Sequence, residues 1–426
     1  MAEFSATVYQ NEFLPDGGTD VNAIVTITCS GAGSAGKTGA GDAGEIIIVD
    51  TSGSMGRSKL EAAKTAASAA IDQILDGTWF AVVAGTHQAY LAYPPVRTGT
   101  GMVRMEPRAR FEAHQAISLF RSDGGTAMGT WLTLAGRLFD SVPMLAQRHA
   151  ILLTDGENHN ETPDQLNTAI RGVTGKFQCD CRGVGVDWQV AEVRRIAQAM
   201  LGTVDIIPSV EEMGQVFAEL MQQSMSRGVP DAQLRVWSPQ GAEVMFVRQV
   251  SPSVEDLSSR RVAVNPLTGS YPTGSWGDES RDYHVSIRLS PKAIGQEQLA
   301  ARVQLTIADQ VVAQGLVKAK WSDDEHLTTR INPEVAHYTG QEELAQAIQE
   351  GLAAKAAGDV DTATVKLGRA VQLAAETGNN EATAKLRKVV DIDNVETGTV
   401  RLKRAVDKAD EMALDTASTK TTRIRS

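Results

Sequence analysis

The chain has 426 residues, of which 42% are hydrophobic and 22% charged, so it is long enough for about three domains of ordinary size and is not disordered throughout. Its net charge of -11 argues against a general affinity for nucleic acid or anionic membranes, because both need a basic protein face. We therefore expect a globular, multidomain protein whose acidity suits cations.

Residues 1–30 predict a β-hairpin. From residue 4 onward, apolar and polar side chains alternate as they do in strands, and a Leu14 to Gly18 turn separates the two runs. Residues 31–44 consist almost entirely of Gly, Ala, Ser and Thr, which is typical of a flexible linker.

Residues 45–226 alternate between predicted strands and predicted helices. This order is typical of a doubly wound, mostly parallel sheet of the Rossmann-like α/β class, with helices on both faces. The predicted strands are Glu45–Asp50, Thr78–Ala84, Gln88–Tyr93, Arg148–Thr154, Gln178–Val186 and Thr203–Ile207. The predicted helices are Gly56–Leu75, Arg108–Phe120, Met128–Asp140, Thr162–Gly172, Gln189–Leu201 and Val210–Ser226.

Residues 227–330 predict an antiparallel β-sandwich, because short alternating runs replace the helical pattern. The N-terminal hairpin has no place in the parallel sheet, so we expect it to pair with this sandwich. The α/β domain would then be an insertion in the sandwich. The strand-like runs are Gln233–Trp237, Ala242–Val247, Arg261–Val264, Tyr283–Leu289, Ala301–Ala308 and Gln310–Lys318.

Residues 331–413 return to a helical pattern and predict a small antiparallel bundle. Asp359 and Asn379 stand where helix N-caps are expected, directly after Gly358 and Gly378.

Residues 414–426 are polar, basic and rich in hydroxyl groups, so we expect a disordered tail. Four of its threonines are candidate targets of a kinase, and their phosphates would suit a phosphothreonine reader lined with arginine. An unmodified tail is an equal alternative. The threonines are Thr416, Thr419, Thr421 and Thr422.

The strongest local signal is the run Asp50-Thr51-Ser52-Gly53-Ser54, between the first strand of the α/β region and its first helix. At the carboxyl end of a parallel strand, such a loop opens onto the crevice where α/β sheets bind ligands. The hydroxyls of Ser52 and Ser54 can point to one position, and Asp50 adds negative charge. These oxygen ligands match magnesium, with Mn2+ or Ca2+ as alternatives.

Two further loops carry complementary oxygen atoms: Gly124-Gly125-Thr126 before a predicted helix, and Thr154-Asp155-Gly156 at the end of a predicted strand. Together with the first run, and in this order, they resemble the metal-ion-dependent adhesion site of the von Willebrand factor A family. The resemblance covers about residues 40–226 and says nothing of residues 228–426.

The resemblance implies a set of ligands for one divalent cation. In the family, the two serines and the threonine bind the cation directly, which corresponds to Ser52, Ser54 and Thr126. The two aspartates, here Asp50 and Asp155, bind it directly or through water. A vacant coordination position accepts a carboxylate from a partner protein.

The sequence motifs support an enzymatic function less well. Residues Gly31 to Thr38 satisfy the P-loop formula, but a P-loop must lead into a helix, and here more glycines and a strand follow. Phosphatases of the haloacid dehalogenase type need a second acid where this chain has Ser52. His159, close to Asp155, is better explained as a surface loop residue than as a base.

We therefore expect a non-enzymatic interaction module that binds an Asp or Glu side chain of a partner protein through its cation. The alternatives are a magnesium-dependent phosphoryl-transfer or hydrolytic enzyme, and a phospho-regulated scaffold of a kinase pathway.

The expected location is cytoplasmic. The N-terminus lacks a signal-peptide pattern, and no stretch reaches the roughly 18 uncharged apolar residues of a membrane helix. Three cysteines are too few for a disulfide framework. No second cysteine or histidine pair lies near Cys179 and Cys181, so these two are expected on one face of a buried strand rather than on zinc.

Overall fold

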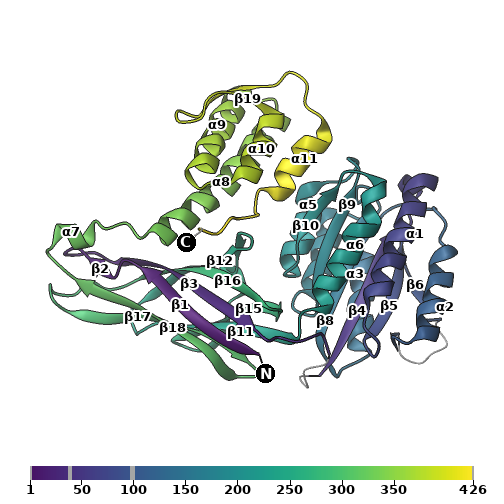
Figure 1. Ribbon diagram of the computed structural model, residues 1–426, viewed down its shortest axis with the longest axis horizontal. Coiled ribbons are helices and arrows are strands. Elements are labelled where there is room, and N and C mark those ends of the chain that lie inside the picture. Colours follow the sequence, from purple (N-terminus) through teal and green to yellow (C-terminus); the bar gives the residue numbers. More distant parts are fainter. Residues whose placement is uncertain (1, 37–40, 96–100, 425–426) are drawn as a thin grey trace. The chain divides into compact units, whose positions relative to one another are not determined.

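The computed structural model describes residues 2–36, 41–95 and 101–424, and the chain divides into two compact units (Figure 1). The first unit is mainly one stretch of sequence, and the second unit precedes and follows it. The first comprises Ala32–Asp231 and Gly274–Gly277. The second comprises Ala2–Gly31, Ala232–Thr273 and Asp278–Ser426.

The first unit contains a seven-stranded β-sheet. Its strands are β4 (Asp42–Asp50), β5 (Trp79–Gly85), β6 (Ala89–Tyr93), β7 (Val103–Arg104), β8 (Leu145–Thr154), β9 (Gln178–Val184) and β10 (Val204–Ile207). Their order is β10-β9-β8-β4-β5-β6, with β7 also on β5; only β6 and β7 run antiparallel to their neighbour. Residues 46–49 of β4 are fully buried, as expected where helices cover both faces of a parallel sheet.

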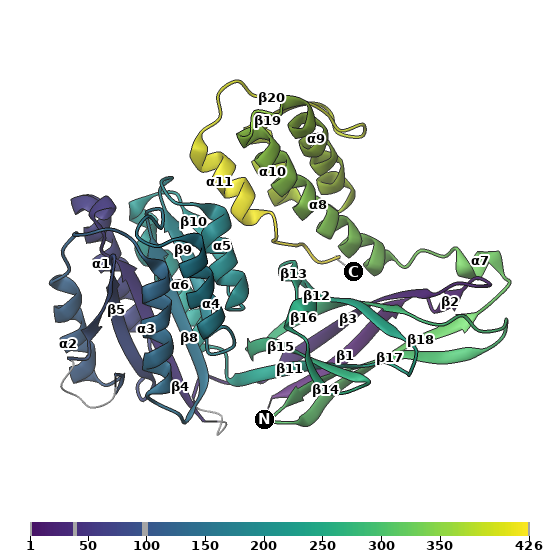
Figure 2. The same cartoon turned by 180° about the vertical axis from the view of Figure 1, so that it is seen from behind.

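Helices cover both faces of this sheet (Figure 2). They are α1 (Gly56–Gln73), α2 (Pro107–Ser118), α3 (Met128–Asp140), α4 (Pro163–Val173), α5 (Val190–Ala199) and α6 (Met213–Met225). α1, α2 and α6 share one apolar core with Ile47 and Val49 of β4 and with Phe80 and Val82 of β5. The arrangement confirms the predicted α/β fold.

The described parts of the Gly-rich stretch are held by hydrogen bonds, in contrast to the flexible linker predicted over residues 31–44. β4 begins at Asp42, which pairs with Leu145, and the Ala35 amide donates a hydrogen bond to the Met225 carbonyl at 2.9 Å. A central parallel strand extends as far as its neighbours offer hydrogen-bond partners, whatever its composition. Lys37 and Thr38, the last residues of the P-loop formula, lie outside the described residues.

The second unit contains two mostly antiparallel sheets. One has the order β1-β3-β16-β12-β13 and the other β14-β15-β11-β17-β18-β2. A Cβ atom built on Gly315 of β18 would lie 2.6 Å from Val8 of β1 and 3.4 Å from Val25 of β3, so the two sheets pack face to face. The bounds of the first sheet are β1 (Glu3–Gln10), β3 (Asp20–Ser30), β16 (Glu279–Arg288), β12 (Glu243–Ser251) and β13 (Glu255–Asp256). Those of the second are β14 (Val262–Asn265), β15 (Thr268–Trp276), β11 (Val229–Trp237), β17 (Glu297–Ile307), β18 (Gln310–Trp321) and β2 (Phe13–Leu14).

The N-terminal strands β1 and β3 lie in the first of these sheets, where β3 pairs with β16 along its length, and the short β2 pairs with β18 in the second. Strand β15 has no counterpart among the predicted elements. Its sequence, Thr268 to Trp276, is rich in Gly, Ser, Thr and Pro, which normally mark turns, yet most of it is buried between β14 and β11. Here the neighbouring strands override the local preference of the sequence.

The second unit ends in helices α7 (Glu325–Thr328), α8 (Pro333–Ala356), α9 (Val360–Glu376), α10 (Asn380–Val389) and α11 (Lys408–Ala417). The predicted N-caps are confirmed, since the Asp359 and Asn379 side chains accept hydrogen bonds from the amides of Thr362 and Ala382. A hairpin of β19 (Val390–Asn394) and β20 (Thr399–Leu402) interrupts the region predicted to be helical. None of the helices in the described ranges has both the length and the apolar character needed to cross a membrane.

Residues 414–424 are ordered, unlike the disordered tail predicted from residue 414, and residues 425–426 lie outside the described residues. Thr416 and Ala417 still belong to α11, Thr421 Oγ1 donates to the Val250 carbonyl at 2.7 Å, and Thr422 Oγ1 accepts from Gln341. The segment's polar side chains are used in hydrogen bonds to other parts of the chain. Three of the four threonines proposed as kinase targets are therefore held by the fold.

A buried charged partner of this segment is Asp282, whose side chain is only 3% exposed. It accepts two hydrogen bonds from Arg423, at 2.9 and 2.6 Å, and others from Thr26 and Tyr338. Arg423→Gln should lower the free energy of unfolding by about 2–3 kcal/mol, because it leaves a buried carboxylate without its cation. The matched control is Arg401→Gln, which breaks an exposed two-bond pair with Asp393 and should change stability by less than about 1 kcal/mol in urea unfolding. Equal effects would show that Arg423 acts only as a surface residue.

Candidate metal centre

Asp50 is the last residue of β4 and lies at the carboxyl edge of the parallel sheet, with its side chain fully buried. Its Oδ1 accepts a hydrogen bond from the Ser52 amide at 2.8 Å, and its Oδ2 accepts one from Thr154 Oγ1 at 2.7 Å. Thr154 ends the neighbouring strand β8. The pairing of these strands therefore fixes the direction of the Asp50 carboxylate.

Ser52, Ser54 and Asp155 continue the same chain of polar groups. The Ser52 and Ser54 hydroxyl oxygens lie 2.9 Å apart, and Ser54 Oγ donates to Asp155 Oδ1 at 2.7 Å. Asp155 directly follows β8 and is fully buried. Four of the predicted site residues are thus connected by hydrogen bonds.

Thr126 comes from the loop before α3, which is tied to the Asp50 loop through backbone groups. The Gly53 amide donates to the Gly124 carbonyl at 2.9 Å, and Asn160 bonds both the amide and the carbonyl of Thr126 at 3.0 Å. A Cβ atom built on Gly156 would lie 3.0 Å from Ser54 Oγ and 3.6 Å from Thr126 Oγ1. The structure therefore brings all of the predicted site residues together.

A positive charge would stabilise the two buried carboxylates of this centre. Burial raises the pKa of Asp50 to about 6; hydrogen bonds from Ser52 and Thr154 act against this rise, and the charge of Asp155 adds to it. Two buried carboxylates with three hydroxyls beside them form the hard oxygen set that suits a divalent cation. No cluster of three or more His, Cys, Asp or Glu side chains arranged for a metal occurs in the described ranges.

Lys59 of α1 also reaches this centre, although it belongs to none of the three motifs that predicted the ligands. Its Nζ lies 2.7 Å from Asp155 Oδ2 and 3.6 Å from Asp187 Oδ2. Burial opposes the charged ammonium, but the hydrogen bond and charge of Asp155, with Asp187, outweigh it and raise the pKa of Lys59. The sequence does contain a signal for this contact. Lys59 lies in the first turn of α1, where a cation opposes the helix dipole and a nearby acid compensates for it.

His159 and the cysteines do not join this hydrogen-bonded centre in the described residues. His159 is 75% exposed and lies 3.5 Å from Glu157, as expected of a loop histidine. Cys179 and Cys181 are buried on β9 with their sulfurs 3.9 Å apart, and Cys29, Cys179 and Cys181 are all free thiols.

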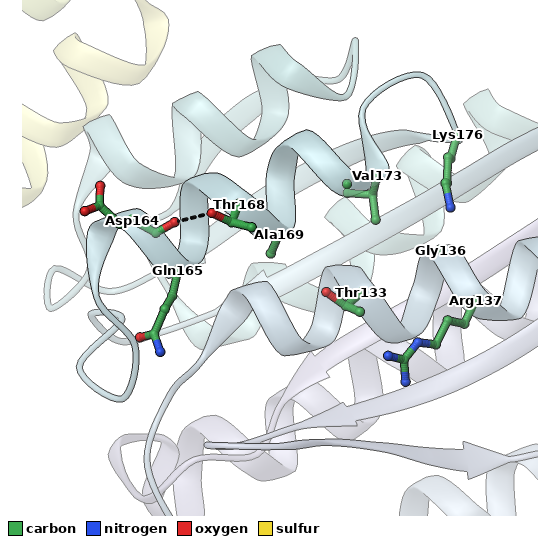
Figure 3. Close-up of a pocket in the computed structure, with 10 residues that line it drawn as sticks. Thr133, Gly136, Arg137, Asp164, Gln165, Thr168, Ala169, Val173 and Lys176 are labelled. Carbon is green, nitrogen blue, oxygen red and sulfur yellow. Dashed lines mark hydrogen bonds between the residues drawn. The ribbon is translucent and has the colours of Figure 1, made fainter.

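A groove of about 610 Å³ lies between α3 and α4 (Figure 3). Arg137 and Lys176 lie near one end and Asp164 near the other, with Gly136 and Ala169 between the helices. None of the candidate ligand residues lines it. The oxygen cluster around Asp50, whose side chains are joined by hydrogen bonds, is the better candidate site.

Comparison with known proteins bears on both units. Residues 45–206 match the family model of the von Willebrand factor type A domain, and residues 372–418 match that of the von Willebrand factor type A C-terminal domain. The chain is 48% identical to a solved structure described as von Willebrand factor type A from Catenulispora acidiphila. That match covers 99% of this chain and 97% of the other, with a TM-score of 0.93.

Two further matches have lower sequence identity. An uncharacterized protein from Synechocystis sp. is 29% identical over 218 residues, and the match covers 50% of this chain and 49% of that protein. The chain thus spans about half the length of the curated relative it matches. The ArnB paralog VWA2 from Sulfolobus acidocaldarius shares the fold, with a TM-score of 0.60 at 14% identity over 98% of both chains.

Proposed function

This chain belongs to the von Willebrand factor A family, whose domains are general protein-interaction modules, and we propose that it binds a carboxylate of a partner protein through a divalent cation at the Asp50 centre. Magnesium is the proposed cation, with Mn2+ or Ca2+ as alternatives. The partner would supply an Asp or Glu side chain and would be neither nucleic acid nor membrane.

One observation supports the proposal above all others. The side chains of Ser52, Ser54 and Asp155 are joined by hydrogen bonds, and the Asp50 carboxylate accepts from the Ser52 amide at the carboxyl edge of the sheet. Such a preformed set needs little reorganisation to bind a cation, so little of the binding free energy is lost to ordering the ligands.

Each residue has a defined part in this proposal. Asp50 and Asp155 would supply the negative charge, while Ser52, Ser54 and Thr126 would supply neutral oxygens that leave the total charge low. Thr154 and Asn160 would keep Asp50 and Thr126 in place through their hydrogen bonds to the Asp50 carboxylate and the Thr126 amide. A bound cation would supply positive charge and a coordination position for the partner's carboxylate.

The carboxylate part can be tested with acetate as the probe. Protein loaded with Mn2+ is titrated with sodium acetate while the relaxation rate of water protons is measured. We expect acetate to lower this rate by displacing metal-bound water, and equal sodium chloride to leave it unchanged. A rate unaffected by acetate would contradict carboxylate binding at this centre.

The rival hypothesis is a magnesium-dependent phosphoryl-transfer or hydrolytic enzyme. At the position of the general acid in such a phosphatase stands Ser52, whose hydroxyl cannot act as an acid near neutral pH. Hydrolysis of p-nitrophenyl phosphate that requires magnesium and disappears in Asp50→Ala would favour the rival. Absence of turnover in a protein that binds the cation would favour the module.

The glycine at position 156 offers a test of the geometry around the hydroxyls. An added methyl group would lie 3.0 Å from Ser54 Oγ, so Gly156→Ala should displace that ligand and weaken Mg2+ binding roughly tenfold in calorimetric titration. Gly172→Ala is the matched control, because nothing lies within 4 Å of its new methyl group. Unchanged affinity in Gly156→Ala would remove Ser54 from the ligand set.

We also propose a cytoplasmic location. All three cysteines are buried free thiols, which suits a reducing compartment. Cell fractionation of the native host, followed by immunoblotting, would test the compartment directly.

A further inference from the structure

The ammonium group of Lys59 lies against one of the carboxylates proposed to hold the cation. Lys59 Nζ and Asp155 Oδ2 are 2.7 Å apart; the Lys59 side chain is 26% exposed, whereas that of Asp155 is 0% exposed. The pair thus has one buried partner and one partner that can reach solvent, so the lysine, and not the aspartate, is free to move.

The two oxygens of Asp155 are shared between two different neighbours. Oδ1 accepts the Ser54 hydroxyl at 2.7 Å, and Oδ2 accepts the Lys59 ammonium at the same distance. Ser54 is itself a proposed ligand. A cation among these oxygens would therefore share the charge of Asp155 with Lys59.

The lysine is not placed there to stabilise its helix. It is the fourth residue of α1, whose first turn has no acidic side chain, and a cation at this end opposes the helix dipole. Asp155 supplies the compensating charge, and Asp187, 68% exposed with its Oδ2 3.6 Å from Lys59 Nζ, offers a second acid nearer to solvent.

We propose that Lys59 is a tethered counter-cation, which neutralises Asp155 in the metal-free protein and competes with the divalent cation for that carboxylate. The inference rests on the proposed function of the Asp50 centre. When a cation binds, the ammonium moves toward Asp187 and solvent. Lys59 thereby sets how much cation is needed, because two positive charges repel each other across one carboxylate.

A different role for Lys59 predicts the opposite result. If the lysine only positioned Asp155 for the cation, its removal would disorder the ligand and weaken binding. If it competes, its removal strengthens binding. The sign of the change in affinity therefore separates the two roles.

The experiment compares Mn2+ affinity and metal-free thermal unfolding for four full-length proteins: wild type, Lys59→Met, Lys59→Arg and Lys64→Met. Methionine keeps the length of the side chain and removes its charge, and arginine retains the charge. Lys64, on the same helix, pairs with Glu61 and is the matched control. We expect Lys59→Met to bind Mn2+ about tenfold more tightly than wild type, and the other two variants to bind as wild type does.

The metal-free proteins provide a second readout. Lys59→Met should unfold at a lower temperature than wild type in the presence of chelator, because Asp155 then lacks its counter-charge, and Mn2+ should raise its unfolding temperature more than that of wild type.

The possible failures can be told apart. Wild type that binds Mn2+ while Lys59→Met binds it equally or more weakly would overturn the role of Lys59 and leave the proposed module intact. No binding of Mn2+ at millimolar concentration by any of the four proteins would overturn both. Binding of Mn2+ by Lys59→Met at lower concentrations than wild type requires would support the competition.

Discussion

Replacing His149 by glutamine is expected to lower the free energy of unfolding by about 3–5 kcal/mol, because two buried carboxylates then lose the cation between them. His149, on β8, is fully buried; its Nδ1 lies 2.7 Å from Glu45 Oε2 and its Nε2 lies 3.0 Å from Asp180 Oδ2. Ser224 and Thr203 complete the cluster by donating to these carboxylates.

The same cluster gives stability a pH dependence. Burial disfavours the imidazolium, but the charges and hydrogen bonds of Glu45 and Asp180 outweigh it and raise the pKa of His149 from 6.5 to about 9. Burial would also raise the pKa of Asp180, but His149, Arg227 and Arg182 hold it well below its usual range. The raised histidine pKa contributes stability that is fully present below the unfolded value and is lost as pH rises through the folded one.

Wild type should therefore lose roughly 3 kcal/mol of unfolding free energy between pH 6.5 and 9, and His149→Gln should lose much less. Urea unfolding at several pH values measures both. The control is His114→Gln, which breaks a partly exposed pair with Asp72 at 2.9 Å and should change stability by less than about 1 kcal/mol. The same decline with pH in His149→Gln as in wild type would show that another group causes it.

The parts of the fold with strong local signals could be predicted from sequence. The predicted helix Met128–Asp140 has the bounds of α3, and the apolar run before Asp50 lies in the central strand β4. The candidate ligands were found because motifs at the ends of strands and before helices meet at one sheet edge. These features depend on short stretches of chain.

Features that depend on distant residues could not be predicted. β15 is a strand because β11 and β14 pair with it, although its own residues favour turns. The C-terminal segment is ordered by Asp282, which is far away in sequence. Lys59 meets Asp155 only once α1 and β8 are placed in three dimensions. In each case the partner, rather than the local sequence, decides the conformation.

The second large effect is expected from Asp50→Asn, which keeps the shape of the side chain and removes its charge. In wild type, Mg2+ at a hundredfold excess over the dissociation constant should raise the unfolding free energy by about 2.7 kcal/mol. The variant should show no such gain at the same concentration, because a buried amide supplies no charge to the cation and Asp50 is one of the two fully buried carboxylates of the centre.

The matched control for this prediction is Asp123→Asn. Asp123 is exposed in the loop that carries Thr126, and its side chain accepts only from the Gly124 amide among the hydrogen bonds of the described residues. This variant should keep the full stabilisation by Mg2+. An equal loss in both variants would mean that the cation acts through general surface charge rather than through the Asp50 centre.

The most direct test of the metal centre is a titration of Mn2+ into chelator-treated protein, in which electron paramagnetic resonance measures the free ion. Wild type should bind about one Mn2+ per chain, as expected for one set of ligands, whereas Asp50→Asn and Asp155→Asn should bind none in the same range. Wild type that binds no Mn2+, or variants that bind it as tightly as wild type, would contradict a cation held by Asp50, Ser52, Ser54, Thr126 and Asp155.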